Sequence, residues 1–189
     1  LVSSRGLGDV YKRQIIWIGP TPTVIKKMGD KLQAKEIAKK VNIPTLDTVE
    51  KVSLAKKIGF PLMIKAAAGG GGKGMRIVKD SASLKDAASA AKREALSGFG
   101  DDRIFFERYI EKSRHIEVQI LGDDKNVVHL GERECSIQRR HQKIIEESPS
   151  RRLSEELRLN ICEDAKRIAQ AIKYTSCLLY TSPSPRDET

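Results

Sequence analysis

The hydrophobic positions of this chain follow two periods, and each period predicts a different kind of element. In HIEVQIL, the residues Ile116, Val118 and Ile120 alternate with polar residues, which is typical of a strand with one apolar face. Towards the end of the chain, hydrophobic residues instead recur at helical spacing after Ser154, a candidate N-cap. The apolar residues of this predicted helix are Leu153, Leu157, Ile161, Ala165, Ile168 and Ile172.

The same patterns predict further elements along the chain. Pro44 ends one predicted helix, and Gly98 closes another. The predicted helices span residues 28–44, 47–58, 83–97 and 153–174. The predicted strands span residues 15–20, 60–65, 75–78, 103–110, 115–121 and 127–132, with a hairpin turn at 122–126. This order indicates an α+β fold with antiparallel hairpins, and it lacks the regular alternation of a doubly wound sheet.

Charge and composition narrow the classes of partner. The 189 residues carry a formal net charge of +10, which suits a nucleic acid, an anionic membrane surface or a phosphorylated small molecule. The basic residues are spread along the chain, so charge alone leaves all three open. Aromatic residues make up only 5% of the chain, which gives few platforms for stacking single-stranded nucleic acid.

The three cysteines form neither a CxxC pair nor an even framework, so we expect packed thiols in a reducing compartment. They are Cys135, Cys162 and Cys177. No apolar run approaches membrane-spanning length, and IIWIG is too short for the apolar core of a signal peptide.

The two ends differ from the rest of the chain in periodicity and composition. Residues 1–14 and 177–189 resemble translated sequencing-adapter scars, and the alternative is that they are ordinary disordered tails. The first flank carries a net charge of +2 and the second −1, so the segment between them carries +9 of the total +10. The basic character therefore belongs to the central segment.

A run of four glycines separates the predicted strands 60–65 and 75–78. Gly69, Gly71 and Gly74 satisfy G-x-G-x-x-G, but a strand follows where the dinucleotide fingerprint requires a helix. A Walker A loop is also excluded, because Lys73 is followed by Gly74 and not by serine or threonine. The run is either a solvent-exposed loop or a hairpin whose backbone N–H groups cover phosphates. Lys65, at the end of the preceding strand, favours phosphate binding.

A second polar cluster fills GERECSIQRRHQKIIEE, residues 131–147. It combines basic and acidic side chains with Cys135 and Ile137, which alternate like buried strand positions. The charged members are Arg133, Arg139, Arg140, Lys143, Glu132, Glu134, Glu146 and Glu147, with His141 beside them. The cluster is either a solvated face or a small basic pocket for an anion.

Four motifs, in order, resemble the ATP-grasp region of the biotin carboxylase family. They are MGDK, MIKAAAGGGGKGMR, FFERYIEKSRHIEVQILGD and GERECSIQRRHQKIIEE, and the resemblance covers residues 15–176. It implies an incomplete ATP-grasp fold preceded by the end of a nucleotide-fold N-terminal domain. Residues 15–44 would end that domain and form the linker helix. Residues 45–110 would form the lid, and 111–176 would begin the C-terminal subdomain.

The resemblance also implies a reaction. Biotin carboxylase uses ATP and Mg²⁺ or Mn²⁺ to activate bicarbonate as carboxyphosphate, and then carboxylates biotin on a carrier protein. The implied partners are that biotinylated carrier and the carboxyltransferase of an acyl-CoA carboxylase of fatty acid metabolism, with neither a nucleic acid nor a membrane. The family further implies a homo-oligomer in the cytoplasm, or in the mitochondrial matrix of a eukaryote.

The family's site residues carry over by motif. Lys31 and Lys65 resemble the two nucleotide lysines, and Lys143 resembles the catalytic lysine beside bicarbonate and the transferred phosphoryl group. Gly71 and Gly72 would be the loop amides over the phosphates. The adenine hinge would be Glu107, Arg108, Tyr109 and Ile110, and the ribose and phosphate side would be His115, Gln138 and His141.

Two departures from the family pattern qualify these expectations. The stretch between NIPT and AKKIGFP is shorter than usual, and the chain stops before the strands that carry the family's metal carboxylates and catalytic arginine. We therefore expect no metal ligand in this chain and no turnover by it alone. The alternatives are another ATP-grasp carbon–nitrogen ligase, against which SIQRRHQK argues, and a basic nucleic-acid-binding module whose affinity would fall steeply with salt.

Overall fold

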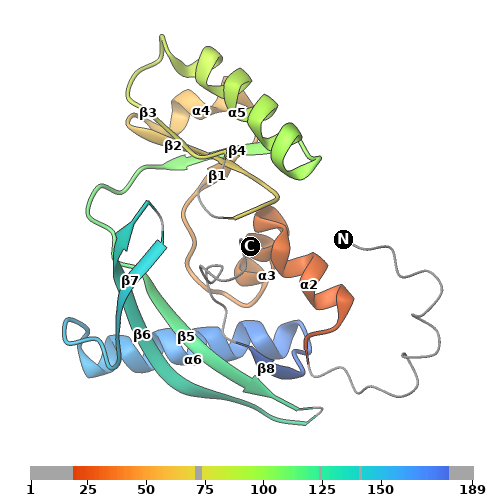
Figure 1. Ribbon diagram of the computed structural model, residues 1–189, viewed down its shortest axis with the longest axis vertical. Helices are drawn as coiled ribbons and strands as arrows, with labels where there is room; N and C mark the ends of the chain where they lie inside the picture. Colours follow the sequence, from red (N-terminus) through yellow and green to blue (C-terminus); the bar gives the residue numbers. More distant parts are fainter. Residues whose placement is uncertain (1–18, 71–73, 124, 141, 179–189) are drawn as a thin grey trace, which may run out of the picture.

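The computed structural model describes residues 19–70, 74–123, 125–140 and 142–178, arranged as two lobes with two helices beside them (Figure 1). The helices are α2 (Pro22–Gly29) and α3 (Lys31–Lys40). The first lobe contains β1 (Thr48–Val49), α4 (Val52–Ala55), a short 3₁₀ helix (Lys56–Ile58), β2 (Leu62–Ala66), β3 (Arg76–Val78), α5 (Leu84–Phe99) and β4 (Ile104–Arg108). The second contains β5 (Ile116–Gly122), β6 (Val127–Arg139), β7 (Gln142–Glu147), α6 (Glu155–Ala171) and β8 (Ser176–Leu178).

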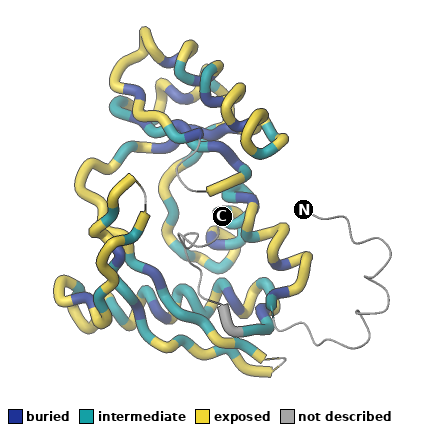
Figure 2. The backbone as a smooth tube through the Cα atoms, viewed as in Figure 1, coloured by how far each residue is buried: buried dark blue, intermediate teal, exposed yellow. Residues whose placement is uncertain are grey.

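The first lobe is an antiparallel sheet covered on one face by helices. Its strands lie in the order β1-β4-β2-β3, and α4 and α5 cover one face (Figure 1). That face is apolar because alternate strand residues, together with the alanines of α5, form one buried cluster. The cluster includes Leu62, Ile64, Ala66, Val78, Ile104, Phe106, Ala88, Ala91 and Ala95. These strands appear as the buried centre of the upper lobe in Figure 2.

The opposite face of the same sheet carries both charged and apolar side chains. Lys65 lies directly across from Phe105, and Met63 lies directly across from Glu107. Since side chains alternate between the faces of a strand, all four lie on the face away from α5. The sheet therefore presents Lys65 and Glu107 to the rest of the molecule.

The second lobe is an antiparallel sheet in the order β7-β6-β5-β8, packed against α6 (Figure 1). Strand β6 contains one more residue than β5 between two of their paired positions, and Gly131 of that segment has φ +89°, as a β-bulge requires. Ser154 caps α6 by accepting a hydrogen bond from Leu157 N at 3.2 Å. A buried carboxylate, Glu132, ties the sheet to α6 by accepting from Arg158 Nε at 3.0 Å.

The sequence-based predictions of strands 60–65, 75–78, 103–110 and 115–121, of the last helix and of its N-cap are confirmed to within a few residues. The prediction of one helix over residues 28–44 is wrong. Asp30 interrupts it, because its carboxylate accepts from the N–H groups of Leu32 and Gln33 and caps α3. Thr21 likewise caps α2, which pattern reasoning missed.

Four further predictions need correction. Residues 47–58 form a short strand, a helix and a 3₁₀ turn, not one helix. Gly100, in the left-handed conformation at φ +70°, ends α5 in place of Gly98. Strand β6 continues to Arg139 well beyond residue 132, and within it Ile137 is 58% exposed, so it is not a buried position. The predicted strand 15–20 is not one of these corrections and stays a prediction, because residues 15–18 lie outside the described residues.

Candidate functional site

The first turn of α3 docks on the segment that leads into the glycine run. Lys31 Nζ donates to the carbonyl oxygens of Ala66, at 3.1 Å, and of Gly69. Its backbone N–H donates to Ala67 O at 3.0 Å. Burial and the neighbouring charge of Lys65 hold the pKa of Lys31 below its usual range. The two predicted nucleotide lysines, from segments far apart in the chain, thus lie close enough to repel each other.

The second lysine belongs to a buried charge cluster. Lys65 forms an ion pair with Oε1 of Glu107, and Lys35 Nζ lies 2.6 Å from Oε2 of the same carboxylate. We call these three residues the Glu107 cluster. Burial by itself raises the pKa of Glu107, but the hydrogen bonds and charges of the two lysines outweigh it, so the pKa lies below its ordinary value. Glu107 is therefore a charged carboxylate at 3% exposure.

The backbone is constrained at the first glycine of the run, Gly69, and at Gly74 just beyond the run. Gly69 has φ +90°, and a Cβ there would lie 2.2 Å from the ring of Phe99 in α5. Gly74 has φ +71°, and its Cβ would lie 3.0 Å from the Cβ of Ala66. Both positions thus require glycine. The predicted loop amides of Gly71 and Gly72 lie outside the described residues.

The predicted hinge residues join the two lobes. Arg108 is the exposed last residue of β4, and the N–H of Tyr109 donates to Pro61 O at 3.2 Å. Ile110 follows and is 46% exposed. The chain then runs to β5 without a further helix or strand, so these residues form the connection between the two lobes.

The predicted ribose-side residues also meet. Gln138 Nε2 lies 2.9 Å from Nδ1 of His115 and donates to Cys135 O at 2.8 Å. The backbone of His115 is fixed as well, since its N–H donates to Ser136 Oγ at 3.0 Å. The structure therefore brings together two of the three residues predicted here, and the third, His141, lies outside the described residues.

The predicted catalytic lysine lies in a second buried charge cluster. Lys143 Nζ donates to Oε2 of Glu117 at 2.6 Å, and Arg133 Nε donates to Oε1 of the same carboxylate at 3.0 Å. We call Glu117, Arg133 and Lys143 the Glu117 cluster. Burial raises the pKa of Glu117, but hydrogen bonds from Lys143 and Arg133 outweigh it and the net pKa is lowered. A charged lysine is thus held in place by a charged carboxylate.

One group of side chains in the described residues has metal-ligand spacing: Glu117, Cys135 and Glu146. Both carboxylates already pair with cations, Glu117 with Lys143 and Arg133, and Glu146 with Arg133 at 3.5 Å and Lys143 at 3.6 Å. Burial, and next the charge of Glu117, raise the pKa of the Cys135 thiol to about 11, whereas a metal ligand would need the thiolate. Both carboxylates of this group are therefore already engaged by the cations of the Glu117 cluster.

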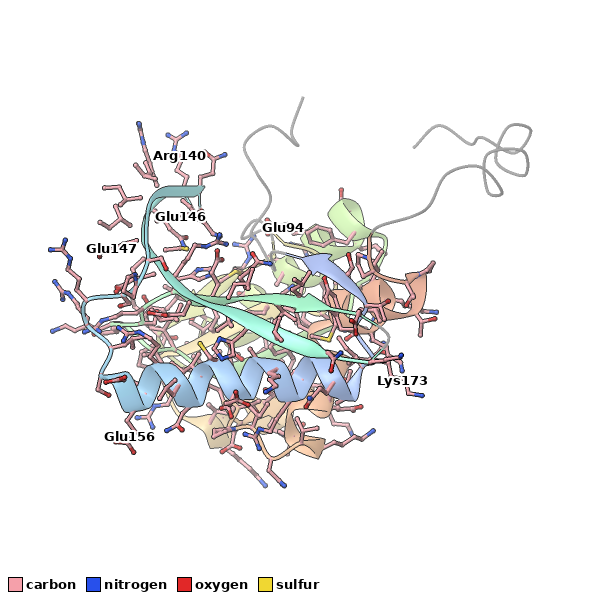
Figure 3. All side chains as sticks on the ribbon, turned by 90° about the horizontal axis from the view of Figure 1, so that it is seen from below. Glu94, Arg140, Glu146, Glu147, Glu156 and Lys173 are labelled. Atoms are coloured by element: carbon pink, nitrogen blue, oxygen red, sulfur yellow. The ribbon has the colours of Figure 1, made fainter. Side chains whose placement is uncertain are left out.

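Three of the four acidic residues in the 131–147 segment form ion pairs with arginines. Glu132 pairs with Arg158 at 3.0 Å, Glu146 with Arg133, and Glu147 with Arg151 at 2.9 Å. Glu134 instead accepts hydrogen bonds from Ser136 and Ser150. Figure 3 shows Arg140, Glu146 and Glu147 at the β6–β7 hairpin, where β7 and the end of β6 project away from α6.

A largely apolar cavity of about 770 Å³ lies between α2, α3, β5 and α6. Its polar lining includes Lys35 of the Glu107 cluster, and His115 and Glu117 from the second lobe. One residue of each charge cluster, Lys35 and Glu117, therefore lines this cavity.

Sequence reasoning missed Lys35 and Glu117. Lys35 follows Lys31 by four residues, so the two share a face of α3, and this spacing is the signal that could have identified it. Glu117 of β5 follows His115, the residue before the strand, by two positions, and alternation places both on the same side. It was interpreted as part of a polar strand face, yet it is among the buried charged residues.

Comparisons with known proteins agree with these features. Residues 26–178 match the family described as the carbamoyl-phosphate synthase L chain, ATP binding domain. The chain is 47% identical over 171 residues to the mitochondrial propionyl-CoA carboxylase alpha chain of Homo sapiens, covering 86% of this chain and 24% of that protein. The chain thus spans about a quarter of the length of this curated relative.

Two solved structures are similar throughout most of the chain. A biotin carboxylase–βγ-ATP complex from Campylobacter jejuni superposes with a TM-score of 0.83 at 43% identity, covering 89% of this chain and 40% of the other. The biotin carboxylase domain of 2-oxoglutarate carboxylase from Hydrogenobacter thermophilus, solved with MgADP, ADP and bicarbonate, superposes with a TM-score of 0.82 at 42% identity, covering 88% and 39%. Within the described ranges, every helix falls short of the length or the hydropathy that a bilayer-spanning helix requires.

Proposed function

The chain belongs to the carbamoyl-phosphate synthase L chain ATP binding domain family, and we propose that it is the ATP-binding part of a biotin carboxylase. Its fold is the ATP-grasp fold of the biotin carboxylase domains that it matches, spanning less than half of their length. The proposed reaction is the ATP-dependent activation of bicarbonate and the carboxylation of biotin on a carrier protein. The propionyl-CoA carboxylase relative supports an acyl-CoA carboxylase as the parent enzyme.

One observation carries the proposal: the convergence of Lys31 and Lys65 where the glycine run begins. Burial and mutual repulsion lower the pKa of Lys31, and a bound polyanion would relieve that repulsion. Phosphoryl transfer relies on such positioned cations more than on a covalent protein nucleophile. A nucleotide's phosphates between these lysines fit the electrostatics of the site.

The remaining residues have proposed roles around that nucleotide. We propose that Gly71 and Gly72 supply backbone amides over the phosphates, and that Glu107, Arg108, Tyr109 and Ile110 hold the adenine. His115, Gln138 and His141 would line its ribose and phosphate side. Lys143, fixed by Glu117, would stabilise bicarbonate and the transferred phosphoryl group.

The proposal includes cofactors and partners. Magnesium or manganese would enter with the nucleotide and neutralise charge on its phosphate oxygens. Biotin would arrive on a carrier domain, and a carboxyltransferase would use the product. We further propose residues 45–110 as the lid and 111–176 as the start of the second ATP-grasp subdomain, in a homo-oligomeric enzyme of the cytoplasm or the mitochondrial matrix.

Calorimetric titration of the full chain with ADP and ATP in the presence of Mg²⁺ tests the proposal. We expect saturable binding of both adenine nucleotides and much weaker binding of GTP. The double variant K31A/K65A should abolish binding, while K39A/K79A removes the same number of positive charges from exposed positions and should bind like the unmodified chain. Absence of adenine nucleotide binding would overturn the proposal. Binding that follows only total charge and collapses with salt would point to a nucleic-acid-binding module.

A further inference from the structure

The Glu107 cluster contains a lysine that the nucleotide-binding proposal leaves unexplained. Lys35 Nζ donates to Thr48 Oγ1 at 2.7 Å and to Leu46 O at 3.2 Å, besides its 2.6 Å contact with Glu107 Oε2. It also lies 5.5 Å from the centroid of the Phe105 ring. One ammonium thus connects α3, the segment that enters the first lobe, and β4.

The two lysines contact different oxygens of Glu107. Lys65 pairs with Oε1 and Lys35 with Oε2, and the carboxylate is buried at 4% side-chain exposure. Each lysine therefore compensates part of one buried negative charge. A buried carboxylate that loses its only cation carries a large penalty, because it cannot recover solvation from water.

Under the proposed function, Lys65 must leave Glu107 to reach the nucleotide's phosphates. That movement vacates Oε1. It would also leave the buried carboxylate without a cation if Lys65 were its sole partner. Lys35 has no such conflict, since Thr48 and Leu46 anchor it away from the glycine run.

We propose that Lys35 is a positioning residue that holds Glu107 charged and in place while Lys65 moves to the phosphates of ATP. The inference rests on the proposed function. Lys35 acts through Glu107 and Lys65 and contacts neither the phosphates nor the reacting groups. Its removal should therefore affect ligands that recruit Lys65 far more than ligands that do not.

The test compares the affinities for ATP and for adenosine, measured by calorimetry on the full chain and on its K35Q, K35M and K35R variants. Without a cation at position 35, the binding of ATP either leaves Glu107 without a cation or proceeds without the contact from Lys65. We expect ATP to bind K35Q and K35M roughly 10- to 100-fold more weakly, the cost of one charge-assisted hydrogen bond. Adenosine recruits no phosphate lysine, so its affinity should change less than about threefold. K35R retains the charge and should restore ATP binding.

Matched controls separate this role from a structural one. K39Q removes an exposed lysine from the same helix and should leave both affinities unchanged. K35Q keeps a donor for Leu46 O and Thr48, so it tests the charge itself and carries the comparison if K35M does not fold. Equal losses for ATP and adenosine, or no loss for either, would overturn this inference alone. Failure of the unmodified chain to bind ATP would overturn both this inference and the proposed function.

Discussion

Lys143 Nζ and Glu117 Oε2 lie 2.6 Å apart, with only 9% and 6% of the two side chains exposed. They come from β7 and β5, which are separated in the sheet by β6. Arg133 of β6 completes the contact from between them. The proposed catalytic lysine is therefore held by a carboxylate two strands away, and its position depends on the register of three strands.

Replacing Glu117 with glutamine should destabilise the chain strongly. The change leaves Lys143 and Arg133 adjacent and without their buried counter-charge, which costs about 3–5 kcal/mol. Glu146 also pairs with Lys143 and Arg133, but its side chain is 40% exposed, so E146Q should cost less than about 1 kcal/mol. Urea unfolding of both variants at pH 7 measures the difference.

We also expect the difference in stability between the unmodified chain and E117Q to depend on pH. The folded pKa of Glu117 is below its ordinary value of 4.5, so its stabilising contribution is complete above that pH and is lost as the pH falls through the folded value. The stability gap between the unmodified chain and E117Q should therefore narrow only below about pH 4.5. A gap of constant size down to pH 3 would contradict the lowered pKa.

The K65A variant should weaken ATP binding without unfolding the protein. Its Nζ supplies one charge-assisted contact to the proposed phosphates, so the affinity should fall roughly 10- to 100-fold, about 1.5–3 kcal/mol. Lys79, exposed just beyond β3, provides the matched control, and K79A should bind ATP normally. Equal affinities for K65A and the unmodified chain would show that Lys65 has no role in binding.

Local patterns were sufficient to predict most of the first lobe. The apolar runs around Leu62 and Phe106 determine two strands. The lysine at the end of β2 could be placed because strand alternation fixes which face it occupies. The break at Asp30 could have been predicted too, since an aspartate after Gly29 is a helix N-cap signal that competed with the longer apolar period.

The ion-pair partners could not be predicted in this way. Glu107 meets Lys35 across 72 positions of sequence, and Glu117 meets Lys143 across 26. Residues so far apart in sequence come into contact only when the strands pair in the correct register. A one-residue shift of that register would move each strand side chain to the opposite face. For the same reason Ile137 was misplaced: β6 contains bulges on both sides of its central segment, so simple alternation fails there.

The two exposed glycines at the start of the glycine run should differ in their tolerance of alanine. Gly69 has φ +90° and faces the Phe99 ring, so G69A should lower the free energy of unfolding by about 1–3 kcal/mol. A Cβ at Gly70 would meet nothing within 4 Å, and its φ is not in the positive range, so G70A should be nearly neutral. Thermal unfolding of the two variants decides this, and equal melting temperatures would contradict the geometry.

The last prediction concerns Cys135, which is fully buried beside the Glu117 cluster. Burial, and next the negative charge of Glu117, raise its pKa from 9.0 to about 11. The folded state therefore retains a proton that the unfolded state releases above pH 9. The contribution of this thiol to stability is complete below pH 9 and is lost as the pH rises to about 11. Consequently, the stability of the unmodified chain should fall more steeply between these two pH values than that of C135S.

At pH 8, iodoacetamide should modify Cys135 at least roughly a hundredfold more slowly in the folded chain than in urea, because the thiolate is the nucleophile. Peptide mass spectrometry identifies the modified site, and rapid labelling of Cys135 in the folded chain would contradict the raised pKa.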